Sequence, residues 1–289
     1  MNNTQGILKT IWIGLNVAKY LLKTGRGLQA TELYDEILIL LHNLDVTNHL
    51  NITEVIFNAY YPISGYANAA RYTNKILEMF HEAGILTIRL AAKYLKEGKL
   101  ALVKRILESA VNITKINGPS KAERVAYSYL GRTLILLGEY QRAREYLVRA
   151  LAIAIEIGDK GGEGASYERL GNVFILLGEY QKAKEYYEKA LPIAIEIGDK
   201  QVQSDSYSRL GSVFKSLGEY QKAKEYCEKA LAIAIEIGNK EVQSSLYSRL
   251  GSVFESLGEY QKAKEYCEKA LAIAIEIGDK QVQRSEERR

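Results

Sequence analysis

The sequence predicts an all-α protein built as a solenoid of stacked antiparallel helix pairs, and three observations lead to this expectation. A stretch beginning GEYQ recurs with a period of 40, at Gly138, Gly178, Gly218 and Gly258. A glycine follows each run of helically spaced apolar residues, as is usual where a helix ends. Only three prolines occur among the 289 residues, and strong helix formers are abundant.

Each regular unit contains two helical patterns. In the first unit they run from about Lys121 to Leu137 and from about Tyr140 to Ile157, and a glycine follows each one. One helix pair alone cannot bury an apolar stripe on both helices, but stacked pairs can. The stripe of the second pattern consists of Ala143, Leu147, Ala150, Leu151, Ala154 and Ile155.

This pattern resembles the tetratricopeptide repeat, a helix pair with a signature of spaced aromatic, leucine, glycine and alanine residues. The period of 40 and the ending ALAIAIEIGDK are similar to the long-repeat branch of that family. This branch includes the G-protein-signalling modulators (Partner-of-Inscuteable type) and the kinesin light chains. The resemblance implies a right-handed superhelical solenoid. The matching residues of the first regular unit are Tyr127, Leu130, Gly131, Leu134, Ala143, Leu147 and Ala150.

A similar spacing of glycines extends into the less regular N-terminal half, with intervals of 40, 33 and 40 residues up to Gly138. Gly25, Gly65 and Gly98 fit it, which predicts seven units in all. A polar loop is expected over 43–53, and a Gly-Pro turn within 117–121 predicts a break.

We therefore expect one continuous solenoid with three segments. Residues 1–117 would form divergent repeat-like helical hairpins, and residues 121–280 would form the four regular units. Residues 281–289 would form a charged stub or the start of a truncated unit, in which a new helix begins at Gln281.

Composition excludes several classes of protein. The net charge of +4 is well mixed along the chain, whereas nucleic-acid binding usually needs a clustered basic face. No stretch is apolar and long enough to span a bilayer, and no signal peptide is evident, so we expect a cytoplasmic protein. Cys227 and Cys267 occupy equivalent places 40 residues apart, which predicts buried free thiols rather than a disulfide or metal pair.

The sequence contains no recognisable catalytic set. Its three histidines lack partners at metal-ligand spacing, and the glycines recur as helix ends rather than as a phosphate-binding loop. We therefore predict no catalytic residue, no metal and no cofactor, and we do not expect an enzyme.

The four regular units differ mainly at one set of positions in the first helix of each pair. These positions are spaced by three, four, three and one residues, which puts them on one helical face. In tetratricopeptide repeat proteins the corresponding face lines the concave groove that binds a peptide. Arg169, Arg209 and Arg249 do not vary but recur along the same groove, one in each of the last three units. The residues that we assign to this peptide-binding groove are Arg132, Arg169, Asn172, Arg209, Ser212, Lys215, Arg249, Ser252 and Glu255.

An acidic segment of a partner would suit the arginines of this groove, because guanidinium groups take carboxylates in bidentate geometry. The alternative is that these arginines are only solvated, or pair with glutamates of neighbouring helices. A clamp for a C-terminal carboxylate, known in the family, is not favoured, since Ser128 and Asp205 stand at two of its places.

We expect a non-enzymatic scaffold, similar to a signalling adaptor, that binds a peptide segment of a partner protein. The second reading is a repeat module of a larger signalling or receptor assembly that self-associates through its open end. The sequence fits a monomer or weak self-association, and it predicts neither a nucleic-acid nor a membrane partner.

Overall fold

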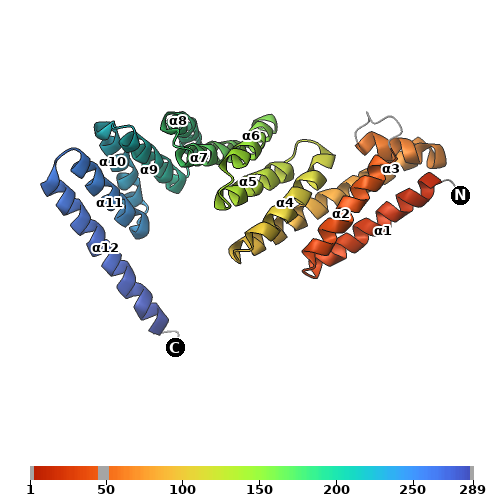
Figure 1. The fold of residues 1–289 in the computed structure, drawn as a ribbon, viewed down its shortest axis with the longest axis horizontal. Helices are drawn as coiled ribbons and strands as arrows, with labels where there is room; N and C mark the ends of the chain where they lie inside the picture. The colour runs from red at the N-terminus through yellow and green to blue at the C-terminus, as the bar shows by residue number, and fades with distance from the viewer. Residues whose placement is uncertain (1–2, 45–51, 287–289) are drawn as a thin grey trace. The chain divides into compact units, whose positions relative to one another are not determined.

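The computed structural model describes residues 3–44 and 52–286, and every regular element in these ranges is helical (Figure 1). It divides into two compact units, Met1–Asp159 and Lys160–Arg289. Within each unit, helices that follow one another in sequence pack as antiparallel pairs. The predicted all-α fold of helix pairs is thus confirmed.

The first unit contains three such pairs. Its elements are α1 (Asn3–Lys23), α2 (Gly27–His42), α3 (Ile52–Lys96), α4 (Leu100–Thr114), the 3₁₀ helix η1 (Lys115–Asn117), α5 (Lys121–Leu136) and α6 (Tyr140–Glu156). Most of the predicted loop over 43–53 lies outside the described residues.

Helix α3 differs from the expected pattern. Its backbone breaks at Gly65, where φ is 74° and ψ is 171°, as predicted for a glycine between two helices. From residue 66 to Lys96 it then runs without interruption, so the turn implied by seven separate units is absent here. Gly84 lies inside this helix and does not end it. A Cβ atom at Gly84 would lie 2.6 Å from Cγ2 of Thr114, so the glycine allows α3 and α4 to approach closely.

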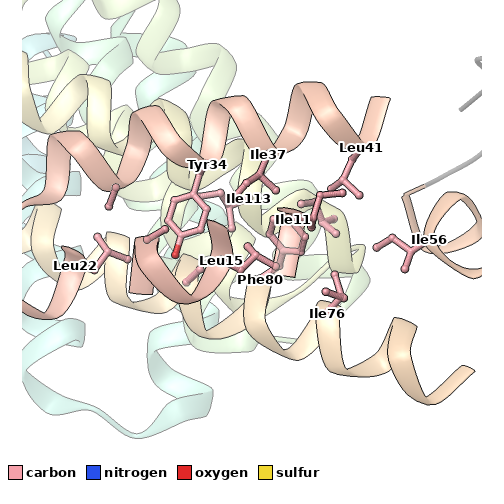
Figure 2. Close-up of a cluster of buried hydrophobic side chains, with 14 residues drawn as sticks. Ile11, Leu15, Leu22, Tyr34, Ile37, Leu41, Ile56, Ile76, Phe80 and Ile113 are labelled. Atoms are coloured by element: carbon pink, nitrogen blue, oxygen red, sulfur yellow. The ribbon is translucent and has the colours of Figure 1, made fainter. Parts of the chain in front are cut away.

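The core of the first unit lies between α1, α2 and α3, with a contribution from the end of α4. Figure 2 shows the side chains meeting there, and Tyr34 and Phe80 are fully buried among aliphatic neighbours. Burial of this much apolar surface is the main force holding the pairs together. The labelled members are Ile11, Leu15, Leu22, Tyr34, Ile37, Leu41, Ile56, Ile76, Phe80 and Ile113.

The second unit repeats one arrangement three times. Its helices are α7 (Lys160–Leu176), α8 (Tyr180–Ile197), α9 (Lys200–Ser216), α10 (Tyr220–Glu236), α11 (Lys240–Ser256) and α12 (Tyr260–Glu286). Each first helix ends near a glycine with φ between 75° and 77°, at Gly178, Gly218 and Gly258. These glycines fulfil the predicted role, since the left-handed conformation caps the last carbonyls.

Two expectations for the end of the chain are wrong. Helix α12 continues through Gly278 to Glu286, so no new helix begins at Gln281. Cys227 is buried as predicted, but Cys267 is exposed. The exposure of Cys267 has a clear cause: in the described residues no helix packs on α12 in the way that α11 packs on α10. The side chains of residues 279–289 lie outside the described part.

Candidate functional site

The first helices of the three pairs in the second unit, α7, α9 and α11, carry most of the predicted groove residues. Asn172, Ser212, Lys215 and Ser252 are half-buried, and Arg249 is exposed. Hydrogen bonds join these residues from one first helix to the next, always between positions 37 apart in sequence. These bonds form three pairs, and we call their six residues the polar row: Asn172, Arg209, Ser212, Lys215, Arg249 and Ser252.

The row begins with Asn172 on α7. Arg209 donates from Nη1 to Asn172 Oδ1 at 2.6 Å, and Tyr187 of α8 donates its hydroxyl to the same oxygen at 2.7 Å. Burial raises the pKa of Tyr187 to about 12, although the nearby Arg209 guanidinium opposes part of this shift. The phenol, like any tyrosine at neutral pH, is protonated, and its donated hydrogen bond holds the asparagine side chain in place.

The row continues through two serines. Arg249 donates from Nη1 to Ser212 Oγ, and Lys215 donates from Nζ to Ser252 Oγ. Ser212 in turn donates to the backbone carbonyl of Ser208 at 3.1 Å. Each hydroxyl thus links a cation to the next helix.

The cations of the row are bound to neutral partners. Among the described residues, none of the ion pairs involves Arg209, Lys215 or Arg249. For Arg209 and Arg249, the described contacts are hydrogen bonds to Asn172 and Ser212 rather than ion pairs with glutamates of neighbouring helices. Their positive charge stays available to a carboxylate from outside the chain.

The other three predicted groove residues are not part of the row. Arg132 is exposed on α5, in the first unit. Arg169 is half-buried and donates from Nη1 to the carbonyl of Ala165 at 3.4 Å. Glu255 is exposed on α11, one turn after Ser252. That all nine residues line one peptide-binding groove stays a prediction.

Sequence reasoning missed two features of this region. Tyr187 occupies the position of Leu147 in the first regular unit, and its hydroxyl holds Asn172. A pocket of about 210 Å³ between α7, α8 and the start of α9 was not foreseen. The available signal for the pocket was Gly161 and Gly164, where the next two units have longer side chains.

Three further observations concern metal sites, membrane spans and reactive thiols in the described chain. No group of three or more potential ligands for a metal ion occurs within residues 3–44 and 52–286. No helix in the same ranges is both long enough and apolar enough to cross a membrane. Cys227 is buried, and this burial raises the pKa of its thiol to about 11, so it is a poor nucleophile at neutral pH.

Comparison with known proteins gives a consistent family. A family model described as the tetratricopeptide repeat (TPR) matches residues 122–196 and 202–281, more than half of the chain. No curated protein matches the sequence significantly.

Solved structures show a similar fold. One is a Podosopora anserina protein with nearly identical TPR-like repeats, described as a kinesin light chain; it is 22% identical, with a TM-score of 0.59 over 67% of this chain and 95% of that one. BtubC from P. vanneervenii is 21% identical, with a TM-score of 0.62 over 78% and 92%. A signal transduction ATPase from Pyrococcus horikoshii with a TPR sensor is 21% identical, with a TM-score of 0.58 over 97% of this chain but 42% of its own.

Proposed function

The chain belongs to the tetratricopeptide repeat family, and from this premise we propose that it is a non-enzymatic scaffold that binds a segment of a partner protein along α7, α9 and α11. Domains of this family are generally protein-interaction modules. The proposed segment is acidic, at least where it meets the polar row. We further propose a cytoplasmic location, which agrees with the free thiols of Cys227 and Cys267.

One observation carries the proposal. The cations of the polar row are held in fixed positions by Asn172, Ser212 and Ser252, which are neutral and leave the charge uncompensated. Ordering these long side chains in advance reduces the entropy that binding would otherwise cost. A row of ordered cations on successive helices is a surface that an extended acidic segment can follow.

The apolar side chains beside the row would supply anchoring contacts. Leu176 on α7 has 46% of its surface exposed, and Ile175 is half-buried beside it. A partner side chain that covers Leu176 would gain roughly 25 cal/mol for each Å² of apolar surface removed from water. The acidic stretch would then set specificity and the apolar contact would add affinity.

Charge reversal in the row tests the proposal. The variant R209E/R249E and the wild-type chain would be used to capture partners from a lysate, with quantification by mass spectrometry. The matched control is K182E/K222E, which reverses two exposed lysines on second helices. Partners that depend on the row should fall at least about tenfold with R209E/R249E and stay with the control. Equal recovery with all three proteins would contradict the proposal, provided that circular dichroism shows equal helicity.

A second candidate function is self-association through α12. Its outward face exposes Tyr260 by 71%, Leu271 by 61% and Ile275 by 55%, and such patches are unusual on a helix that faces only water. Sedimentation velocity over a range of concentrations would test this candidate. A dimer that disappears in L271E/I275E would support it, whereas a monomer at every concentration would remove it.

A further inference from the structure

A pocket opens in the second unit between the first half of α7, the last half of α8 and the start of α9. Its volume is about 210 Å³, many times the space that one water needs. The walls are mainly aliphatic, with Ile193 and Ile197 from α8 and Val202 from α9. Two carboxylates, those of Glu168 and Asp199, complete the lining.

The pocket is lined by a glycine, Gly164, at a position where the neighbouring pairs have no glycine. At the position of Gly164, the next two units have Ser204 and Ser244. Their hydroxyls fill the space between the two helices of a pair: Ser204 donates to the carbonyl of Ala230 at 3.0 Å, and Ser244 donates to that of Ala270 at 2.9 Å. Gly164 has no hydroxyl that could make this bond, and Ile193 of α8 lies close to it instead: an added Cβ atom would be 3.1 Å from Ile193 Cγ2.

The two carboxylates are held in place without being neutralised. Glu168 accepts a hydrogen bond from Ser206 Oγ at 2.9 Å, and Asp199 accepts one at 3.1 Å from the backbone N–H of Val202, where it caps α9. Each carboxylate keeps lone pairs for another donor. Neither belongs to an ion pair found among the described residues, and no lysine or arginine lines the pocket.

We propose that this pocket binds a basic side chain, lysine or arginine, of the partner segment; this inference rests on the function proposed above. Such a side chain has an aliphatic stem that fits against Ile193 and Ile197, and a cationic end that meets Glu168 and Asp199. Asn172, the first residue of the polar row, lies one helical turn after Glu168 on α7. The segment would therefore carry a basic anchor next to its acidic stretch.

The test uses small probes and the full chain, so it does not need the partner. Spectra of the Ile δ1 methyl groups would be recorded while n-butylammonium or n-propylguanidinium, which mimic the two side chains, is added at constant ionic strength. Butyrate and 1-butanol serve as matched anionic and neutral probes. We expect saturable shifts at Ile193 and Ile197 with the cations, and roughly tenfold weaker binding of butyrate.

Three variants sharpen the result. G164S introduces the residue found in the next two units and should abolish binding by filling the pocket. D199N keeps the cap, because Asn239 caps α11 in the same way, and E168Q keeps the shape of Glu168. Each of these two variants should bind the cationic probes severalfold more weakly and should bind 1-butanol as the wild type does.

Two results would overturn the proposal: no saturable shift with either cation, or equal binding of cations, butyrate and 1-butanol. Failure of the proposed function is a separate outcome. In that case the cations would still bind, while R209E/R249E would lose none of its partners.

Discussion

Helices α10 and α12 have the same sequence over 17 residues, Tyr220–Glu236 and Tyr260–Glu276, and yet they differ in burial. Leu231 of α10 is 8% exposed, whereas the equivalent Leu271 of α12 is 61% exposed. Cys227 and Cys267 differ in the same way. Ala230 and Ala270, which face the first helix of their own pair, are buried in both.

This difference shows that each second helix has two apolar faces, and that each face is buried by a different neighbouring helix. One face is covered by the partner within the pair, and the other only by the first helix of the next pair. In the described chain α11 covers α10, and nothing corresponds to α11 beyond α12. Burial here is set by the neighbouring pair rather than by the local sequence, as expected for a repeat protein with nearest-neighbour stabilisation.

The largest expected effect is on thiol reactivity. In C267S only the buried Cys227 remains, and in C227S only the exposed Cys267 remains. A disulfide reagent such as DTNB should react with Cys267 at least about 100-fold faster than with Cys227 at pH 8. Only thiolates attack the reagent, and Cys227 is buried, which raises the pKa of its thiol to about 11. The two rates should converge in urea. Similar native rates would mean that α11 does not cover α10 stably.

Truncation of the equivalent leucines should have the next largest effect. L231A should lower the free energy of unfolding by about 2–4 kcal/mol, because it leaves a cavity between α10 and α11. L271A should change it by less than about 0.5 kcal/mol, as is usual for an exposed site. Urea unfolding followed by circular dichroism would measure both. Equal losses would show that α12 is covered in solution, for example by a second copy.

Gly211 and Gly251 lie where the two helices of a pair approach closely, and substituting them should have a smaller effect on stability. A Cβ atom at Gly211 would lie 2.5 Å from Cys227 Sγ, and one at Gly251 would lie 2.7 Å from Cys267 Sγ. Only Cys267 can turn toward solvent to relieve this contact. G211A should therefore cost about 1–3 kcal/mol and G251A less.

The added variant C227A tests the cause of this cost. If the contact with sulfur is responsible, G211A/C227A should be more stable than additivity of the two single changes predicts. Full additivity would assign the cost to the backbone carbonyl of Ala223, which lies 3.2 Å from the same Cβ position.

Much of the fold could be predicted from the sequence, because its signals are local. The glycines at 25, 65, 98, 138, 178, 218 and 258 all adopt positive φ, as their place after a helical stripe indicates. The exceptions depend on tertiary packing. Gly84 lies inside α3, where an added Cβ atom would be 2.6 Å from Thr114 Cγ2, and Gly278 lies inside α12, on which no following pair packs in the described residues.

The candidate site could be predicted only in part, because it too depends on tertiary packing. Comparison of the four units located the variable face, but not the hydrogen bonds between residues 37 apart, since these require the stacking distance of the pairs. Tyr187 and Asn172 both differ from the residues at the equivalent positions of the other units. The reason for this paired difference is visible only in the structure, where the two side chains are hydrogen-bonded. The pocket was also missed, although Gly161 and Gly164 differ from the residues of the next two units, because a cavity depends on how the side chains of α7, α8 and α9 pack.

The smallest expected effect is a change in the free energy of unfolding with pH, which arises from Cys227 on α10. The ordinary pKa of a cysteine thiol is near 9, and burial raises that of Cys227 to about 11. Between these values the unfolded chain loses the proton while the folded chain keeps it, so stability must fall as pH rises.

This effect can be isolated in a C267S background, which removes the exposed thiol. The difference in unfolding free energy between C267S and C227S/C267S should shift by about 1 kcal/mol between pH 7.5 and pH 10, to the disadvantage of the chain that keeps Cys227. Tyrosines that titrate at high pH affect both chains and cancel. A constant difference across this range would mean that Cys227 reaches water in the native state, and α10 would then resemble α12 after all.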